Sequence, residues 1–306
     1  MSDTLASLRR KIEGAGKVKS VVRTMKAMAA SSIGQYEAAV RALADYERTV
    51  ALGLTACFRQ DGPVATPYLS QPKSASVGAI VFGSDQGLAG QFNEVMADFV
   101  VQTLAKLPGE KKVWVVGERL HARLSDGGMP LVGLYAVPNS VTAIVPLVGR
   151  IQIDCEAHST RAEHAYYHEY NNASEHIFVF HNRPQSGAQY RPVCQRLLPL
   201  DAQWQQGITA TSWPTSILPE ALGAENDTLR ALIREYLFIS LFKACAESLA
   251  SENASRLAAM QRAEKNIDTL STQLNRTFYR LRQGAIDEEL FDVITGFNAL
   301  DTEKPK

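Results

Sequence analysis

The feature that most constrains this sequence is a long stretch, from Glu225 to Gln283, that contains neither glycine nor proline. Its apolar residues recur at steps of three and four, as they do along one face of a helix. They are Leu229, Leu232, Ile233, Tyr236, Leu237, Leu257, Met260, Ile267, Leu270, Leu274, Phe278 and Leu281. At about 1.5 Å per residue such a helix would be about 85 Å or longer, which exceeds an ordinary globular helix. A coiled coil is therefore indicated, and the alanines between Ala244 and Ala263 would let a partner helix approach closely.

The N-terminal region shows the same pattern. No proline occurs between Thr4 and Phe58, and apolar residues again recur at helical spacing. One long helix is predicted, with Gly14 and Gly16 as positions where it is weakened and where it can bend. The Gly62–Pro63 pair marks its end.

Between these two regions, short apolar runs alternate with helical patterns. The predicted strands are Val77–Gly83, Lys112–Gly117, His176–Asn182 and Val193–Leu200. The predicted helices are Gln91–Lys106, Glu118–Leu124 and Val141–His158, the last continuing to Asn171. Such alternation predicts a mostly parallel, Rossmann-like sheet with crossover helices.

The expected fold is therefore α/β with a long antiparallel coiled coil. The N- and C-terminal helices form a shaft, and the α/β domain is inserted between them. The expected parts are residues 1–60 as the first shaft helix, 61–224 as the inserted domain with an irregular segment at 201–224, and 225–300 as the second shaft helix.

Composition excludes some classes of protein. The formal net charge is zero and 45% of the residues are hydrophobic, so a sizeable core is expected and nothing global indicates nucleic acid. Four scattered cysteines without a CxxC motif indicate isolated thiols in a reducing compartment. The first residues lack the apolar core of a secretory signal, and no stretch is long and apolar enough to predict a membrane span.

The run VGAIVFGSDQGLAGQFNEV combines a strand, a glycine turn and a helix, which are the parts of a phosphate-binding loop. Its glycines, Gly83, Gly87 and Gly90, fit neither the dinucleotide fingerprint nor a Walker loop. No lysine is available to reach a phosphate, and Asp85 would repel one. Nor does Ser84 lie in an esterase elbow. A structural turn without a cofactor is the favoured interpretation.

Two histidines, His164 and His168, are four residues apart and share a helix face if that segment is helical. A zinc site needs at least one further ligand, such as Glu169. Surface histidines beside tyrosines are the favoured alternative, so neither a metal site nor a catalytic residue is predicted.

Basic residues gather near both ends of the chain. Residues 1–30 hold seven lysines and arginines against Asp3 and Glu13, and residues 256–283 hold six against Glu264 and Asp268. In an antiparallel pair these basic segments lie at the same end of the shaft. A solvated helix face is one explanation and an acidic partner is the sharper one. Nucleic acid is disfavoured because aromatic residues are not interleaved with the charges.

Three segments carry a resemblance: LRRKIEGAGKVKSVVRTMKAMAAS, FGSDQGLAGQFN, and SENASRLAAM with FYRLRQGAIDEELFDVITGFNAL. Over nearly its whole length the chain resembles the gamma subunit of F-type ATP synthases, the central rotor. It departs from the family at Gln86 and Ala89, where arginine and cysteine are usual, and at Lys26, where glutamate is usual. These departures look like a divergent branch, similar to the alternative N-type ATPases.

The resemblance implies a non-catalytic shaft that turns inside a hexamer of alpha and beta subunits and couples ion flow through a membrane ring of c subunits to ATP synthesis or hydrolysis. It implies a peripheral position at the cytoplasmic face of the membrane. Contacts with the hexamer would come from Arg23, Met25, Lys26, Arg256, Arg282 and Gln283. Trp213 and Pro219 would lie in a foot that meets the epsilon subunit and the ring. We expect Lys26 to attract acidic loops of the beta subunits.

Two other functions remain open on the sequence alone. A nucleotide-dependent enzyme built on the α/β domain would bind nucleotide in isolation. A free-standing coiled-coil adaptor would be stable as a monomer or homodimer and would not co-purify with alpha and beta subunits.

Overall fold

The computed structural model describes residues 4–60, 76–159, 175–185, 189–198, 200, 202–210, 213–215, 217, 219 and 225–302. Two long helices dominate it, α1 (Leu5–Gln60) and α6 (Glu225–Thr302). Thr4 caps α1 through its hydroxyl, which accepts a hydrogen bond from the Ser7 amide at 3.3 Å. These helices confirm the two long helical regions predicted from the periodicity.

The chain divides into two compact units, and the division cuts both long helices. The first unit holds Met1–Met28 and Ala258–Lys306, and the second holds Ala29–Leu257. In the first unit Lys19 pairs with Asp268 and Lys26 pairs with Glu264, so the two helices run antiparallel. Leu8, Val22 and Met260 are buried there, as a two-helix seam requires. The predicted antiparallel pairing is confirmed.

The second unit contains a five-stranded sheet in the order β3-β2-β1-β4-β5. Its strands are β1 (Ser76–Phe82), β2 (Lys111–Val116), β3 (Leu131–Tyr135), β4 (Glu175–Pro184) and β5 (Tyr190–Leu198). β1 is parallel to β2 and β4, and β2 is parallel to β3, whereas β5 is antiparallel to β4. β1 lies at the centre, which explains why its sequence is almost wholly apolar.

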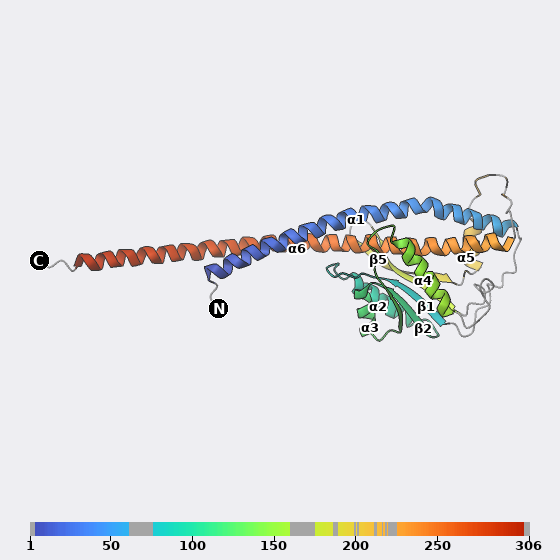
Figure 1. Cartoon of the computed structure of the whole chain (residues 1–306), viewed down its shortest axis with the longest axis horizontal. Coiled ribbons are helices and arrows are strands. Elements are labelled where there is room, and N and C mark those ends of the chain that lie inside the picture. Colours follow the sequence, from blue (N-terminus) through green and yellow to red (C-terminus); the bar gives the residue numbers. More distant parts are fainter. Residues whose placement is uncertain are drawn as a thin grey trace. The chain divides into compact units, whose positions relative to one another are not determined.

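Helices cover both faces of the sheet (Figure 1). On one face α2 (Phe92–Leu104) and α3 (Glu118–Asp126) pack on alternate residues of β1 and β2, such as Val81 and Val115. The other face carries Trp114 and Val179, which pack with α4 (Ile144–Ser159) and with the parts of α1 and α6 that belong to this unit. The mostly parallel sheet with crossover helices predicted from the alternating pattern is confirmed.

Two elements differ from the sequence prediction. β3 escaped it because the strand is short, carries Gly133 and has a register shift opposite Val113 and Trp114 that breaks the alternation of apolar residues. The sequence predicts an irregular segment at 201–224, yet α5 (Ala202–Thr209) forms within it. Trp204 of this helix packs against the ring of Phe58 at 5.9 Å and against Tyr236 at 5.1 Å. These tertiary contacts outweigh the weak local helix signal.

The position of β5 in the sheet explains why this strand can contain a proline. β5 lies at the edge of the sheet, where Pro192 costs no ladder hydrogen bond on the open side.

Among the described residues, no helix combines the length and apolar character needed to cross a membrane. Gly62–Pro63 and the predicted continuation of α4 to Asn171 lie outside the described residues.

Candidate functional site

In the first unit, a cluster of charges joins the two long helices. Lys26 Nζ lies 2.5 Å from Glu264 Oε2, and Arg23 Nε lies 2.8 Å from Glu264 Oε1. Each carboxylate oxygen therefore accepts a charge-assisted hydrogen bond from a different cation. One turn further along α6, Asp268 pairs with Lys19. All three connections run between α1 and α6 rather than along one helix.

The charges of this cluster are strongly coupled. Hydrogen bonds from Lys26 and then from Arg23 lower the pKa of Glu264 to about 2. The carboxylate is consequently ionised throughout the neutral range, and its bonds to both cations persist there. Only acid well below pH 4 would release them, as the pH falls toward the lowered pKa.

The exposed fractions of the side chains separate the two cations. Arg23 leaves 61% of its side chain exposed, whereas Lys26 leaves 35% and Glu264 leaves 17%. Met25, which lies between Arg23 and Lys26 in the sequence, is half-buried. The guanidinium of Arg23 can therefore reach a partner while it is bound to Glu264. The ammonium of Lys26 is directed to a carboxylate of its own chain.

The remaining predicted contacts divide between the two units. Arg282 and Gln283 lie on α6 in the first unit and are exposed, with Gln283 Nε2 donating to Asp287 Oδ1 at 3.1 Å. Arg256 lies in the second unit, where only 9% of the residue is exposed. Its Nη2 lies 2.6 Å from Glu252 Oε1. The guanidinium of Arg256 is therefore used within the chain.

Near its C-terminal end α6 carries an exposed apolar stripe that the sequence interpretation missed. Its members follow one another at spacings of seven, four, three and one residues and so share a helix face: Tyr279, Ile286, Leu290, Val293 and Ile294. Each is between 46% and 69% exposed. Periodicity could have shown the stripe, but periodicity does not tell whether the chain itself or a partner covers it.

The position of the stripe explains its exposure. Lys11 and Ala15 of α1 line an apolar groove of about 440 Å³ together with Leu274 of α6. α1 runs antiparallel to α6 and its first residue is Leu5, so α1 does not extend much farther toward the C-terminal end of α6 than this groove. The stripe lies beyond the start of α1, and no helix of the described part of the chain covers it.

In the second unit, the predicted glycine turn connects β1 to α2, and two of its glycines are required. A Cβ at Gly83 would lie 2.4 Å from Cβ of Leu120, because α3 packs directly on the end of β1. Gly90 has a φ of 63°, in the left-handed region that favours glycine. At Gly87 a Cβ would fit without a close contact, and the backbone does not have a positive φ. The structure thus assigns two different causes to what looked like one motif.

A Gly83→Ala substitution tests the close packing of α3. We expect it to destabilise the chain by about 2 kcal/mol or more, because the methyl group overlaps Leu120 and the backbone must shift. Urea denaturation of the purified chain measures the change. Gly87→Ala is the matched control, because the nearest atom to its added Cβ would be 3.9 Å away. Equal stability of the two variants would contradict the packing argument.

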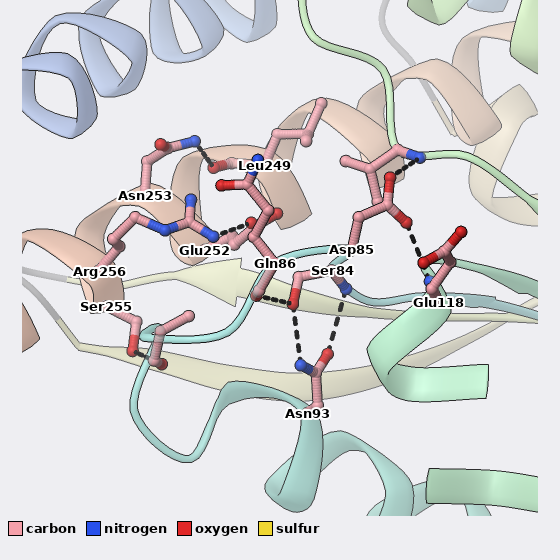
Figure 2. Close-up of polar contacts among 12 residues, drawn as sticks. Ser84, Asp85, Gln86, Asn93, Glu118, Leu249, Glu252, Asn253, Ser255 and Arg256 are labelled. Atoms are coloured by element: carbon pink, nitrogen blue, oxygen red, sulfur yellow. Dashed lines mark hydrogen bonds and ion pairs between the residues drawn. The ribbon is translucent and has the colours of Figure 1, made fainter. Parts of the chain in front are cut away.

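Asp85 connects three segments at the carboxyl ends of the parallel strands (Figure 2). Its Oδ1 accepts from the amide of Glu118, at the start of α3, and its Oδ2 accepts from the amide of Val137, both at 2.9 Å. The N-terminus of a helix at this edge is where α/β proteins commonly bind phosphate. Here the chain's own carboxylate takes that position, which gives the turn a structural role.

Ser84 likewise has its hydrogen bonds satisfied locally. Its hydroxyl accepts from Asn93 Nδ2 at 2.8 Å and donates to the carbonyl of Gln86 at 3.0 Å. The Ser84 amide donates to Asn93 Oδ1 at 3.1 Å. Ser84 is fully buried, so this reciprocal pair joins the turn to α2 and presents no exposed nucleophile.

The predicted foot residues lie in sparsely described sequence. The indole nitrogen of Trp213 lies 2.9 Å from both the Thr215 hydroxyl and the Ile217 carbonyl, which closes a local turn. Ile217 is 78% exposed and Pro219 is exposed. His164 and His168 lie outside the described residues. Within the described ranges, no group of three or more His, Cys, Asp or Glu side chains is placed to hold a metal ion.

Comparison with known proteins agrees with the resemblance seen in the sequence. The profile of a family described as ATP synthase matches residues 4–300. The ATP synthase gamma chain of Dechloromonas aromatica is 24% identical over 299 residues, covering 96% of this chain and 98% of that one. The gamma chain of Frankia casuarinae is 28% identical over 310 residues, covering 98% and 99%.

Solved structures extend the likeness to the fold. A chain of the Euglena gracilis mitochondrial ATP synthase, in its OSCP/F1/c-ring assembly, superposes with a TM-score of 0.66 at 15% identity and covers 99% of this chain and 97% of that chain. A chain from the central stalk and c-ring of the Tetrahymena thermophila enzyme gives 0.53 at 18% identity, covering 79% and 99%. At these identities the similarity concerns the fold alone. Because the family profile spans nearly the whole chain, this protein belongs to the ATP synthase family, among the gamma chains.

Proposed function

We propose that this chain is the central-stalk rotor subunit of an F-type ATP synthase. It couples ion flow through a membrane ring to ATP synthesis or hydrolysis in a hexamer of alpha and beta subunits. The observation that carries the proposal is the apolar stripe, together with the family of the chain. An apolar helix face past the end of its partner helix needs an enclosing protein, and a hexamer with a central channel supplies one.

The chain contributes no active site of its own in this proposal. A shaft with different side chains on each side meets the surrounding subunits unequally, so each rotational position favours a different state of each catalytic site. Binding energy at those sites and rotation of the shaft are then linked equilibria. Asp85 at the start of α3 and the internal bonds of Ser84 support a structural α/β domain.

The bonds within the chain support two different roles for the predicted contact residues. We propose that Arg23, Met25, Arg282 and Gln283 face acidic loops of the beta subunits. Lys26 instead holds Glu264, and Arg256 holds Glu252, so both support the helices from within the chain. This proposal differs from the expectation that Lys26 attracts acidic loops of the partner directly.

The remaining parts follow the division made on the sequence. Residues 1–60 and 225–300 would form the shaft. Residues 61–224, including Trp213 and Pro219, would form a foot that meets the epsilon subunit and the ring of c subunits. The chain would act as a peripheral subunit at the cytoplasmic face of the membrane.

Assembly with partner subunits tests the proposal. The chain, tagged, is co-expressed with the alpha, beta and epsilon subunits of the same organism, and the purified material is assayed for ATP hydrolysis. We expect a stable complex whose hydrolysis, after reconstitution with the ring in vesicles, drives ion transport. Recovery of the chain alone, as a monomer or homodimer, would favour an adaptor. Nucleotide binding by the isolated chain in calorimetry would favour an enzyme.

A further inference from the structure

In the second unit, α6 packs on the α/β body through a buried polar seam, which consists of Glu247, Ser251 and Ser255. These residues are four apart, so they form one ridge along the helix. The exposed fractions are 8% for Glu247, none for Ser251 and 7% for Ser255. On one side of this ridge the helix is apolar and equally buried, as Ala246, Leu249 and Ala250 show, and on the other side lie the buried polar residues Ser248, Glu252 and Arg256. Three polar residues in line within such a contact call for an explanation.

Every member of the seam bonds to a different point of the body. Glu247 Oε2 lies 2.8 Å from His181 Nε2 and 2.9 Å from Arg183 Nε, both on β4. The Ser251 hydroxyl donates to the carbonyl of Asn182 at 2.9 Å. Along the helix, the Ser255 hydroxyl donates to the carbonyl of Ala89 in the glycine turn at 2.5 Å, a contact drawn in Figure 2. The seam thus connects α6 to β4 and to the turn that precedes α2.

The charge state of the first member is set by its partners. Burial opposes ionisation of Glu247, but hydrogen bonds from His181 and Arg183 outweigh it and lower the pKa of the carboxyl group. Since a carboxylate can only accept, His181 donates through Nε2. Burial lowers the pKa of His181, so the imidazole is neutral near pH 7. The carboxylate is therefore held by one neutral and one cationic donor.

This arrangement defines one register of α6 on the body. An apolar helix face rich in alanine offers several registers of similar packing, because a one-turn shift replaces one small residue by another. A shift that moved Glu247 away would leave His181 and Arg183 without an acceptor. The shift in the opposite direction would bring Lys243, which lies four residues earlier, toward the cationic Arg183. Buried polar contacts are known to specify register in this way.

We propose that the polar seam is the register lock through which torque passes between the α/β body and α6. The inference rests on the proposed rotor function. A rotor must not let its shaft helix slide or turn on the domain to which it is attached, and apolar packing alone resists such movement weakly. With the seam present, each shifted register has a higher free energy, because the shift leaves buried polar groups without hydrogen-bond partners.

The test uses the complete complex in vesicles and measures ATP hydrolysis and ATP-driven ion transport in the same preparation. For Ser251→Ala/Ser255→Ala we expect transport per ATP to fall about 25-fold, because two hydrogen bonds are lost and the loss of each typical bond changes an equilibrium about fivefold. Glu247→Leu should likewise lower transport per ATP. Glu247→Gln should retain most of the ratio, because its amide oxygen still accepts from Arg183.

Matched variants separate the register lock from plain destabilisation. Ile239→Val and Leu241→Ala trim buried apolar residues of the same helix and remove no hydrogen bond. The one whose melting temperature matches that of the serine double variant serves as control, and it should keep the wild-type ratio. An unchanged ratio in the seam variants, or an equal fall in the control, would overturn the seam proposal. If the wild-type complex itself transports no ions during hydrolysis, the rotor function fails instead.

Discussion

In the assembled complex, Glu264→Lys is expected to lower transport per ATP several-fold, and adding Lys26→Glu to the same chain is expected to restore much of it. The single change replaces the shared acceptor of Lys26 and Arg23 by a third cation, so α1 and α6 repel each other where they were joined. The double change recreates an opposite-charge pair at the same place. Paired hydrolysis and transport assays on vesicles measure the ratio.

This charge exchange also decides between two roles for Lys26. If Lys26 acted on an acidic loop of a partner, Lys26→Glu would add repulsion to the damage of Glu264→Lys, and the double variant would be worse than either single one. Rescue is expected only if the two side chains act on each other. Lys106→Glu, an exposed reversal of the same size in the second unit, serves as control and should leave the ratio unchanged.

The second large effect is expected at the apolar stripe. Leu290→Glu with Val293→Glu should prevent stable assembly, because both side chains are exposed in the isolated chain and would be buried by the partner. Burying such a side chain contributes about 1.5–3 kcal/mol, so two charged replacements should weaken binding at least about 100-fold. Co-purification with alpha and beta subunits, followed by ATPase assay, measures the loss.

The isolated chain provides the control for this result. Its melting temperature should not change, because neither residue contributes to its own core. Glu288→Lys alters the charge on the opposite side of the same helix and should leave assembly intact. A double variant that assembles and hydrolyses ATP like the wild type would show that the stripe is not covered in the complex.

Much of the fold could be predicted because its signals are local. The absence of glycine and proline from Glu225 to Gln283, with apolar steps of three and four, indicates one helix whatever surrounds it. The apolar run at β1 likewise needs only burial on both faces. α5 could not be predicted in the same way, since Trp204 is held by Phe58 and Tyr236, which are distant in sequence.

The candidate site was harder to predict for the same reason. The concentration of basic residues near both termini is visible in the sequence, but which acid each cation meets depends on the register of two antiparallel helices. That register brings Glu264 to Lys26 and Arg23, and it leaves Tyr279, Leu290 and Val293 beyond the start of α1. In the sequence, Arg256 is one of the basic residues near the C-terminus, but in the structure it is buried and pairs with Glu252.

The sequence by itself determined the two long helices, the inserted α/β domain and the missing lysine of the glycine turn, because periodicity, residue type and spacing are properties of short segments. Only the tertiary structure decided that Asp85 occupies the start of α3, that Lys26 pairs with Glu264, and that Glu247, Ser251 and Ser255 bond α6 to the body. Each of these depends on contacts between residues far apart in the chain, and packing sets such contacts.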